Sequence, residues 1–583
     1  MASKSCGGFR LRSASSDPKQ RRVRAGCFSL QAALGLTALA ILMSSVAAAQ
    51  ASAQPSAASR GAATARSTQA PIAPVGTEPN GPLRDGLLVY VRRIEVVGST
   101  VLSEHDLAAV TAPFENRLLS SDELQELRLR LSRLYVERGY VNSGARIPDQ
   151  EVVDGVVRIE ITEGRLTRLE IRGTERLRDS YLRERIVPDP NAPLNVEVLQ
   201  ERLQVLQQDV LIERLVGTLR PGSVPGESVL DLEVAEAQPY RLGIIFANDR
   251  PPAVGAEQLR IHFAHHSVSG RGDSLVVEPA LTEGLRDLSV AYALPLPGGR
   301  TQLELFYEDT NADVVEEPFD EVDITGSLTS FGAGLRYWIV RRPGSELSMG
   351  LRFDRRRGRT TLLDRPAPLS PGADDDGRTE LNAIRFSQDW LARGLDRVVA
   401  ARSLLTFGLS GSSSARPGGD ADGSFVSWQG QFQWVQRLAE NDAQLIARTA
   451  AQVATRALLP MEQFQIGGAQ SVRGYRESQL LRDNGITASL EYRIPLGQVV
   501  GRETAPSAWH NMQLAFFGDI GHGVNREFRA ATPHTLASLG LGLVWDPAPG
   551  VHGELYWGYA LRERPTGDDL QDEGVHFSIQ LFY

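Results

Sequence analysis

The sequence has almost no cysteine or lysine. Its cysteines, Cys6 and Cys27, and its lysines, Lys4 and Lys19, all lie among the first 27 of 583 residues. If this N-terminal segment is removed on export, the rest of the chain has neither disulfides nor thiol chemistry. It also has no lysine for a nucleotide-binding P-loop, a Schiff base or a serine–lysine dyad.

Long apolar runs are equally scarce. Past Met43, no stretch approaches the ~20 consecutive apolar residues of a membrane-spanning helix. The apolar run Phe28–Met43 follows an arginine-rich segment and precedes small residues up to Ala49, so we predict a secretory signal peptide over residues 1–49. An exported chain without a spanning helix can cross a membrane only as a closed β-barrel. The net charge of -9 argues against nucleic acid as a partner.

Two further N-terminal features concern organisation. Residues 50–88 are rich in Ala, Ser, Pro, Thr and Gly, which predicts a flexible linker. An internal repeat follows: "RRIEVVGST" (92–100) recurs as "TRLEIRGTE" (167–175), and "VVRIEITEG" (156–164) recurs as "VLDLEVAEA" (229–237). The repeat of roughly 75 residues predicts two small α+β units, 89–163 and 164–238, each with the order strand, helix, helix, strand, strand.

Helical patterns fill the space between these strands. Ser120 and Glu123 form a capping box, and Gly139 marks a helix end. Two apolar stripes at helical spacing complete the prediction: Leu124, Leu127, Leu131, Leu134 and Tyr135 in the first unit, and Leu199, Leu203, Leu206 and Val210 in the second.

From residue 239 to 583 helical periodicity gives way to segments of alternating residues. We count about sixteen such segments, within the range of bacterial outer-membrane barrels, and short links alternate with longer ones. The last segment, Val575–Tyr583, alternates to its final residue. Because a strand edge needs a partner, we predict that it pairs with the first barrel strand, near Tyr240–Asp249, and with the strand before it. The predicted fold class is therefore α+β domains followed by a transmembrane antiparallel β-barrel.

One long link in the barrel carries a distinctive motif. Thr455–Asn484 contains "QIGGAQSVRGYRESQL", in which Val472, Arg473, Gly474 and Tyr475 are consecutive. Two strands later, "FFGDIG" supplies Phe517, Asp519 and Gly521. Asp519 has the opposite parity to Leu514 and Phe516, so it faces the lumen if they face lipid. A guanidinium can hold a carboxylate with two parallel hydrogen bonds, and Gly474 permits a tight turn beside it.

These features together resemble a known family. The two repeats resemble POTRA (polypeptide-transport-associated) domains, which lie in the periplasm of Gram-negative bacteria ahead of an outer-membrane barrel. The tetrad Val472–Tyr475 and the motif around Asp519 resemble those of the two-partner secretion transporters, the haemolysin-activator family that exports haemolysins and filamentous haemagglutinins. The resemblance implies that the loop folds into the lumen, where Arg473 meets Asp519.

The resemblance also implies the function and partners. The POTRA units would recruit an unfolded, secreted partner protein by lending it a sheet edge, and the barrel would pass it to the cell surface. Phe577, Ile579, Leu581 and Tyr583 resemble the C-terminal signal read by the barrel-assembly machinery, and the strands would contact outer-membrane lipid. No cofactor or metal is implied. Some family members begin with a pore-plugging helix, but residues 50–86 contain too much Pro and Gly to predict one.

Three other functions are compatible with parts of this sequence. A barrel-assembly factor of the BamA or TamA type shares the loop arginine but usually has more POTRA units. A passive porin leaves the repeats unexplained. "GDSL" around Ser274 matches a serine-esterase signature, and Asp519–His522 matches its acid–histidine spacing, but such hydrolases need helices beside the sheet and none is predicted here. We therefore expect no enzyme. His262, His265 and His266 lie on both faces of one strand, so we expect no metal site.

Overall fold

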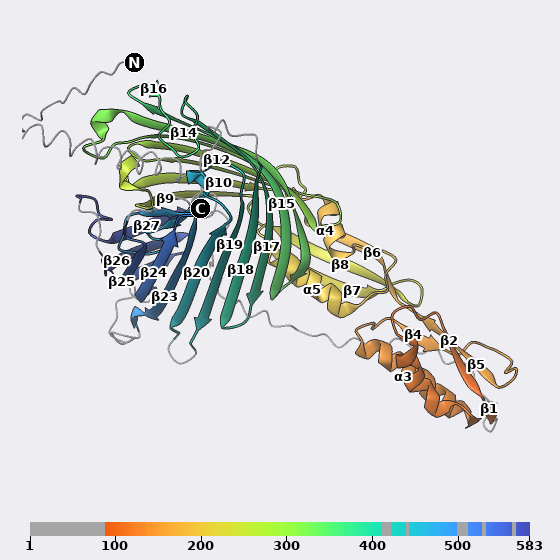
Figure 1. The fold of residues 1–583 in the computed structure, drawn as a ribbon. Helices are drawn as coiled ribbons and strands as arrows, with labels where there is room; N and C mark the ends of the chain where they lie inside the picture. The colour runs from red at the N-terminus through yellow and green to blue at the C-terminus, as the bar shows by residue number, and fades with distance from the viewer. Residues whose placement is uncertain are drawn as a thin grey trace, which may run out of the picture.

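The computed structural model describes residues 88–409, 421, 423–438, 442–497, 511–526, 532–562 and 567–583. The predicted signal peptide lies outside these residues, and so does the predicted linker except for its last residue, Leu88. Figure 1 shows two small units of helices and strands, coloured orange to yellow, that lead into a wide barrel. No helix among the described residues is long and apolar enough to cross a membrane.

The first unit is a three-stranded sheet covered by helices. Its sheet has the order β2-β5-β4, with β2 parallel to β5, and a separate pair, β1 and β3, closes one end. The elements are β1 (Val89–Val91), β2 (Arg93–Val97), α2 (Glu104–Thr111), η1 (Ala112–Phe114), β3 (Arg117–Leu119), α3 (Ser121–Glu137), β4 (Gly144–Arg146) and β5 (Val156–Thr162).

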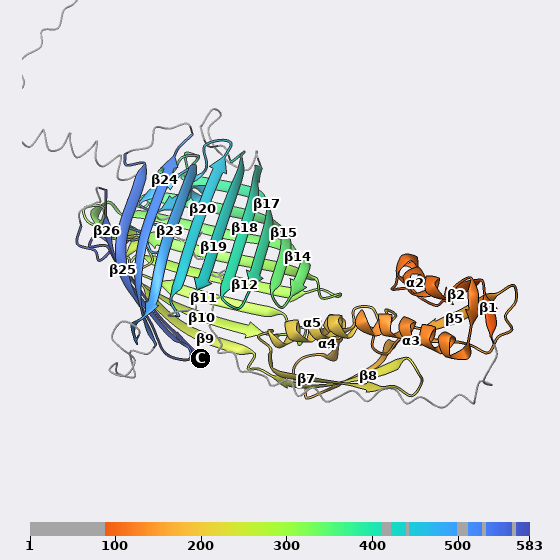
Figure 2. The ribbon, with the colours of Figure 1, turned by 90° about the horizontal axis from the view of Figure 1, so that it is seen from below.

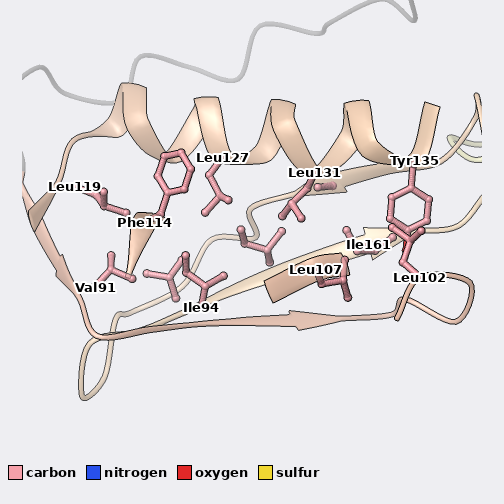
Figure 3. Close-up of a cluster of buried hydrophobic side chains, with 13 residues drawn as sticks. Val91, Ile94, Leu102, Leu107, Phe114, Leu119, Leu127, Leu131, Tyr135 and Ile161 are labelled. Carbon is pink, nitrogen blue, oxygen red and sulfur yellow. The ribbon is translucent and has the colours of Figure 1, made fainter. Parts of the chain in front are cut away.

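The core of this unit lies under α3. Leu127, Leu131 and Tyr135 are fully buried against the sheet, as Figure 3 shows, because they recur at the helical spacing predicted from the sequence. The predicted capping box is confirmed: the Ser120 hydroxyl accepts from the Glu123 N–H, and the Glu123 carboxylate accepts from the Ser120 N–H.

The second unit repeats this arrangement. Its sheet has the order β6-β8-β7 with β6 parallel to β8, and its elements are β6 (Arg165–Arg172), α4 (Asp179–Ile186), α5 (Val196–Gln207), β7 (Ile212–Pro221) and β8 (Glu227–Glu236). Leu199 and Leu206 are buried as the stripe predicts, but the prediction for Val210 is wrong. The helix ends at Gln207, so Val210 lies in the following turn and is exposed.

The two units are joined end to end through their longer helices. Figure 2 shows α3 and α5 in line. The Val196 N–H donates to the Gly139 carbonyl (2.9 Å), and the Asn195 amide donates to the Arg138 carbonyl (2.8 Å) while it accepts from the N–H groups of Glu197 and Val198. One asparagine side chain thus caps α5 and binds the end of α3.

Sixteen antiparallel strands then close a barrel, as predicted. They are β9 (Tyr240–Ala247), β10 (Gln258–His266), β11 (Ser274–Leu281), β12 (Leu285–Pro295), β13 (Thr301–Asp313), β14 (Ile324–Arg342), β15 (Ser345–Leu362), β17 (Arg378–Arg393), β18 (Arg397–Leu409), β19 (Val426–Arg437), β20 (Gln444–Ala454), β23 (Asn484–Pro495), β24 (Met512–Val524), β25 (Thr535–Ala548), β26 (Val551–Ala560) and β27 (Val575–Phe582). Shorter pieces in the links are η2 (Pro252–Val254), η3 (Asp320–Val322), β16 (Arg365–Pro366), η4 (Pro460–Glu462), β21 (Phe464–Ile466) and β22 (Leu480–Arg482).

The last strand pairs as the sequence predicts. β27 pairs with β26 on one side and with β9 on the other, where Ser578 lies opposite Ala247 and Phe582 opposite Gly243. In the part of the chain that the structure describes, the closed ring leaves no strand edge of the wall unpaired.

The second unit touches one end of the barrel. The Arg178 N–H donates to the Gly270 carbonyl (2.8 Å), and the Gly298 N–H donates to the Glu184 carboxylate (3.1 Å). Gly270 and Gly298 belong to two of the short links, so the short turns lie on the side of the two units. The longer links that the structure describes, such as the one between β20 and β23, lie at the opposite end.

Candidate functional site: an arginine loop in the barrel lumen

The link between β20 and β23 enters the barrel. It starts after Ala454, passes through η4, continues as the hairpin β21–β22, and carries the predicted tetrad at the hairpin tip. Val472, Arg473 and Tyr475 are 0%, 2% and 1% exposed. Their partners are inward-facing residues of β23 to β27, so the tip of the link lies in the lumen against this wall.

Arg473 is held by two carboxylates from neighbouring strands. Its Nε and Nη2 donate to Oδ2 and Oδ1 of Asp519 on β24 (2.8 and 2.9 Å), and its backbone N–H donates to the same Oδ2 (3.0 Å). Its Nη1 donates to Oε2 of Glu491 on β23 (2.5 Å). Asp519 and Glu491 are 4% and 0% exposed, so both charges depend on this arginine and its neighbours for compensation.

Aromatic rings cover the guanidinium. Its carbon lies 3.6 Å from the centre of the Phe517 ring and 4.8 Å from that of Tyr556 on β26. The Tyr556 hydroxyl donates to Glu491 (3.1 Å). Arg493 also binds Glu491, through its Nε at 2.5 Å. The Arg473 guanidinium is therefore enclosed by charged side chains and aromatic rings.

Two glycines allow the loop to approach the wall. Gly474 has φ +88°, and a Cβ there would lie 2.6 Å from the Gly558 carbonyl oxygen. Its N–H donates to Nε2 of His576 on β27 (3.2 Å). Gly521, the predicted partner on β24, faces the loop closely, because a Cβ there would lie 2.3 Å from Ile466 and 2.9 Å from Val472. Any side chain at these positions would push the loop away.

Tyr475 joins the loop to the outer ends of the strands. Its hydroxyl donates to the Ala537 carbonyl (3.0 Å) and accepts from the Arg562 N–H (3.0 Å). Its ring belongs to an apolar cluster whose buried members are Phe464, Ile466, Val472, Tyr475, Leu480 and Leu536. The following residue, Arg476, pairs with Asp572 (2.5 Å) and Glu316 (2.7 Å) from two outer links.

Sequence reasoning singled out Arg473, Phe517, Asp519 and Gly521, and the structure brings them together. It missed Glu491 and Tyr556, which have the parity of lumen residues but carry no motif. It also missed a second group of charges at the start of the link, where Glu462 meets Arg385. The signal that could have pointed there is the unusual arginine run 355–357 on β15.

The C-terminal residues lie elsewhere, on the outer face. Ile579 and Leu581 are 48% and 45% exposed there, and the Phe577 ring lies 5.3 Å from that of Phe246 across the β27–β9 seam. They do not touch the loop site. Among the described residues, no group of three or more His, Cys, Asp or Glu is arranged to hold a metal ion.

Comparison with known proteins identifies the two regions. The model of the haemolysin secretion/activation protein ShlB/FhaC/HecB family matches residues 226–544, more than half of the chain. The ShlB-type POTRA domain model matches residues 89–164.

Individual relatives agree with these matches. The outer membrane transporter CdiB of Dickeya dadantii strain 3937 is 24% identical over 411 residues, which cover 68% of this chain and 70% of that protein. The solved structure of CdiB from Escherichia coli has a TM-score of 0.66 and 20% identity, covering 87% of this chain and 92% of that one. CdiB from Acinetobacter baumannii has a TM-score of 0.62 and 18% identity, covering 86% and 91%. At these identities the structures establish the fold alone.

The family match separates this barrel from the alternatives. The matched family consists of transporters and not enzymes, so the prediction of no enzyme is confirmed. Ser274 of the esterase-like signature is simply the first residue of β11. The predicted family and location are also confirmed. The chain belongs to the haemolysin secretion/activation family and is a two-partner secretion transporter of the outer membrane, with its POTRA region in the periplasm.

Proposed function

We propose that the Val472–Tyr475 loop is the gate of the transport route. A two-partner transporter has a secreted partner, and the proposed route for that partner is the barrel lumen. The seated loop occupies the lumen, so a passing polypeptide has to displace it. The observation that carries this proposal is the burial of Arg473 between Asp519 and Glu491 on the barrel wall. An ion pair with aromatic cover can hold the loop in one position and still release it as a unit.

The partner would be recruited in the periplasm as an unfolded chain. The proposed POTRA units are residues 89–163 and 164–238, ahead of a barrel at 239–583, and the second has the same strand order as the first. Among the described residues, no further strand pairs with the outer edges of β2 and β4 in the first sheet or of β6 and β7 in the second. An extended polypeptide can add to such an edge as a further strand. The second unit abuts the short turns of the barrel, so a chain held there is close to the entrance.

Two further partners concern the making of the barrel. The alternating face of β27, with Phe577, Ile579, Leu581 and Tyr583, would be read by the barrel-assembly machinery. Its exposed apolar side chains would then contact membrane lipid. Folding of the secreted protein outside the cell would give transport its direction, since the chain after residue 27 has no lysine for a nucleotide-binding P-loop.

Secretion of a candidate partner tests the gate. Cells would carry the unchanged protein, Arg473→Ala, or Arg473→Asp combined with Asp519→Arg, and barrel assembly would be followed by heat-modifiable mobility in gels. A clear change in export by the single variant, with the barrel assembled, supports the proposal, because the bond between Arg473 and Asp519 then controls passage. If the double variant exports like the unchanged protein, the ion pair between positions 473 and 519 is the element that transport requires. Normal export by an assembled Arg473→Ala barrel refutes the gating role.

A further inference from the structure

We propose that Glu462 is a second positioning residue of the loop. It would fix the root of the loop, residues 455–463, to the wall formed by β15 and β17, so that the part that moves is the hairpin and tip, residues 464–482. The inference rests on the proposed gating function and specifies which segment of the loop is released.

The contacts of Glu462 are those of a strong ion pair. Arg385 on β17 grips its carboxylate with two parallel hydrogen bonds, Nη1 to Oε2 (3.0 Å) and Nη2 to Oε1 (2.7 Å). Arg356 on β15 approaches Oε1 through Nη1 (3.2 Å), and the same nitrogen donates to the Met461 carbonyl (3.3 Å). Two strands of the wall thus hold one carboxylate of the loop.

The buried surroundings of Glu462 and Arg385 make their ion pair costly to break. The side chains of Glu462, Arg385 and Arg356 are 6%, 7% and 6% exposed. Asp354, which is fully buried, accepts a hydrogen bond from Nε of Arg385 and thereby orients the guanidinium towards Glu462. If Glu462 left, the wall would retain buried arginines that the remaining aspartate cannot fully compensate.

Apolar packing supports the root at the same place. Leu458, Leu459 and Met461 are almost fully buried in one cluster. The wall residues of this cluster include Leu328 from β14 and Leu381 from β17. Moving the root would expose three large apolar side chains and one paired charge. This costs much more free energy than moving an exposed link.

The return arm of the loop is tied to the same root. Asp483 accepts from the Leu458 N–H (3.0 Å) and from the Gln463 amide (3.0 Å). Gln452 of β20 donates to the carbonyls of both Glu462 (3.0 Å) and Asp483 (3.2 Å). The two ends of the link therefore form one block, from which the β21–β22 hairpin extends.

The two attachment points have opposite polarity. At the tip the loop supplies the cation, Arg473, and the wall supplies the anions. At the root the loop supplies the anion, Glu462, and the wall supplies the cations Arg385 and Arg356. Each wall site would repel the loop residue that belongs to the other site, so the loop has a single electrostatically favourable seating.

Thiol labelling of the full-length protein in membranes tests which part moves. Because the chain has no cysteine after Cys27, a single thiol can be placed cleanly at the tip by Val472→Cys or at the root by Leu458→Cys. Both positions are buried in the seated loop, 0% and 1% exposed. Reaction with a water-soluble maleimide therefore reports release of each part separately.

We expect Arg473→Ala to raise labelling at position 472 by at least about tenfold and to leave position 458 protected. Glu462→Gln should expose position 458, whereas Glu462→Asp, which keeps the charge, should retain most of the protection. Arg357→Gln is the matched control, because Arg357 neighbours Arg356 on β15 but is 53% exposed and pairs with Glu380 instead.

Each outcome bears on the inference. If Arg473→Ala exposes both positions together, or if Glu462→Gln leaves position 458 protected like the control, the root is not a fixed anchor and the inference is wrong. If position 472 stays protected in Arg473→Ala, the proposed gate itself is refuted. Should Glu462→Gln barrels not assemble, Arg385→Lys decides, since lysine keeps the charge without the two-pronged grip. Unchanged protection at position 458 in that variant would also overturn the inference.

Discussion

Replacing Gly558 by alanine tests how closely the loop is seated against the barrel wall. Gly558 lies on β26 and faces Gly474 of the loop. A Cβ at position 558 would lie 2.6 Å from the Gly474 nitrogen, 2.7 Å from its Cα and 2.8 Å from the carbonyl carbon of Arg473. All three are backbone atoms, so no side chain can rotate to relieve the contact.

The size of the effect follows from this geometry. Carbon atoms in ordinary contact are about 3.5–4.0 Å apart, so the loop has to retreat by roughly 1 Å. That retreat stretches the bonds of Arg473 to Asp519, now 2.8 and 2.9 Å long, and the bond of Gly474 to His576. Inserting a methyl group into a packed interior costs about 1–3 kcal/mol. The ratio of seated to displaced loop should therefore fall by roughly 5- to 150-fold.

Labelling at position 472 measures this ratio. Gly558→Ala is combined with Val472→Cys, and the rate of maleimide reaction is compared with that of Val472→Cys alone. Heat-modifiable mobility confirms that the barrel has assembled. Faster labelling by the factor above is the expected result, because only the displaced loop exposes position 472.

Two other glycines provide matched controls. Gly553→Ala adds a methyl group to the same strand, but its nearest neighbours are atoms of Trp545 at 3.8 Å, so no effect is expected. Gly298→Ala adds left-handed backbone strain (φ +90°) in open space far from the loop. If Gly558→Ala labels no faster than Gly553→Ala, the loop does not rest on β26 and the reasoning fails.

Three further predictions concern other parts of the chain. Ile579→Arg places a charge on the outer face of β27 and should cost roughly 1–3 kcal/mol; less protein in the outer membrane is expected, and normal assembly would contradict the lipid-facing position. Asn195→Ala removes the cap of α5 and the bond to Arg138, for about 1–2 kcal/mol, so hydrogen exchange should speed up in the first turn of α5 and remain unchanged in α2. Burial raises the pKa of Tyr135 to about 12, above the ~10 of the unfolded chain. Tyr135 should thus contribute fully to the free energy of unfolding of the first unit below pH 10, and this contribution should fall as the pH rises from 10 towards 12. Hydrogen exchange of α3 measures this change, and Tyr135→Phe should remove the part of the pH dependence that is due to Tyr135.

Local patterns carried most of the fold prediction. The apolar stripe of α3 and its Ser120–Glu123 cap are set by residues three and four positions apart, so they can be read without knowing the tertiary structure. The two-residue alternation of the barrel strands is equally local. Where a pattern continued past its helix, as at Val210, the prediction was wrong because the turn after Gln207 changes the direction of the chain.

The site was predictable only in part. Arg473 and Asp519 could be paired because each lies in a recognisable motif and because parity places Asp519 in the lumen. Glu491, Tyr556 and the contact of Glu462 with Arg385 could not be predicted. Many lumen residues share the same parity, and which of them meet depends on the register of distant strands and on the path of the loop across the barrel.

The amino-acid sequence by itself determined the repeated units, the number of strands and the side of the wall that most residues of each strand face, because all of these depend on spacing along the chain. Only the tertiary structure decided where the loop rests and what holds it. Closure of the barrel brings β15, β17, β23, β24 and β26 around one lumen. Buried charges in that lumen are stable only where partners from different strands surround them.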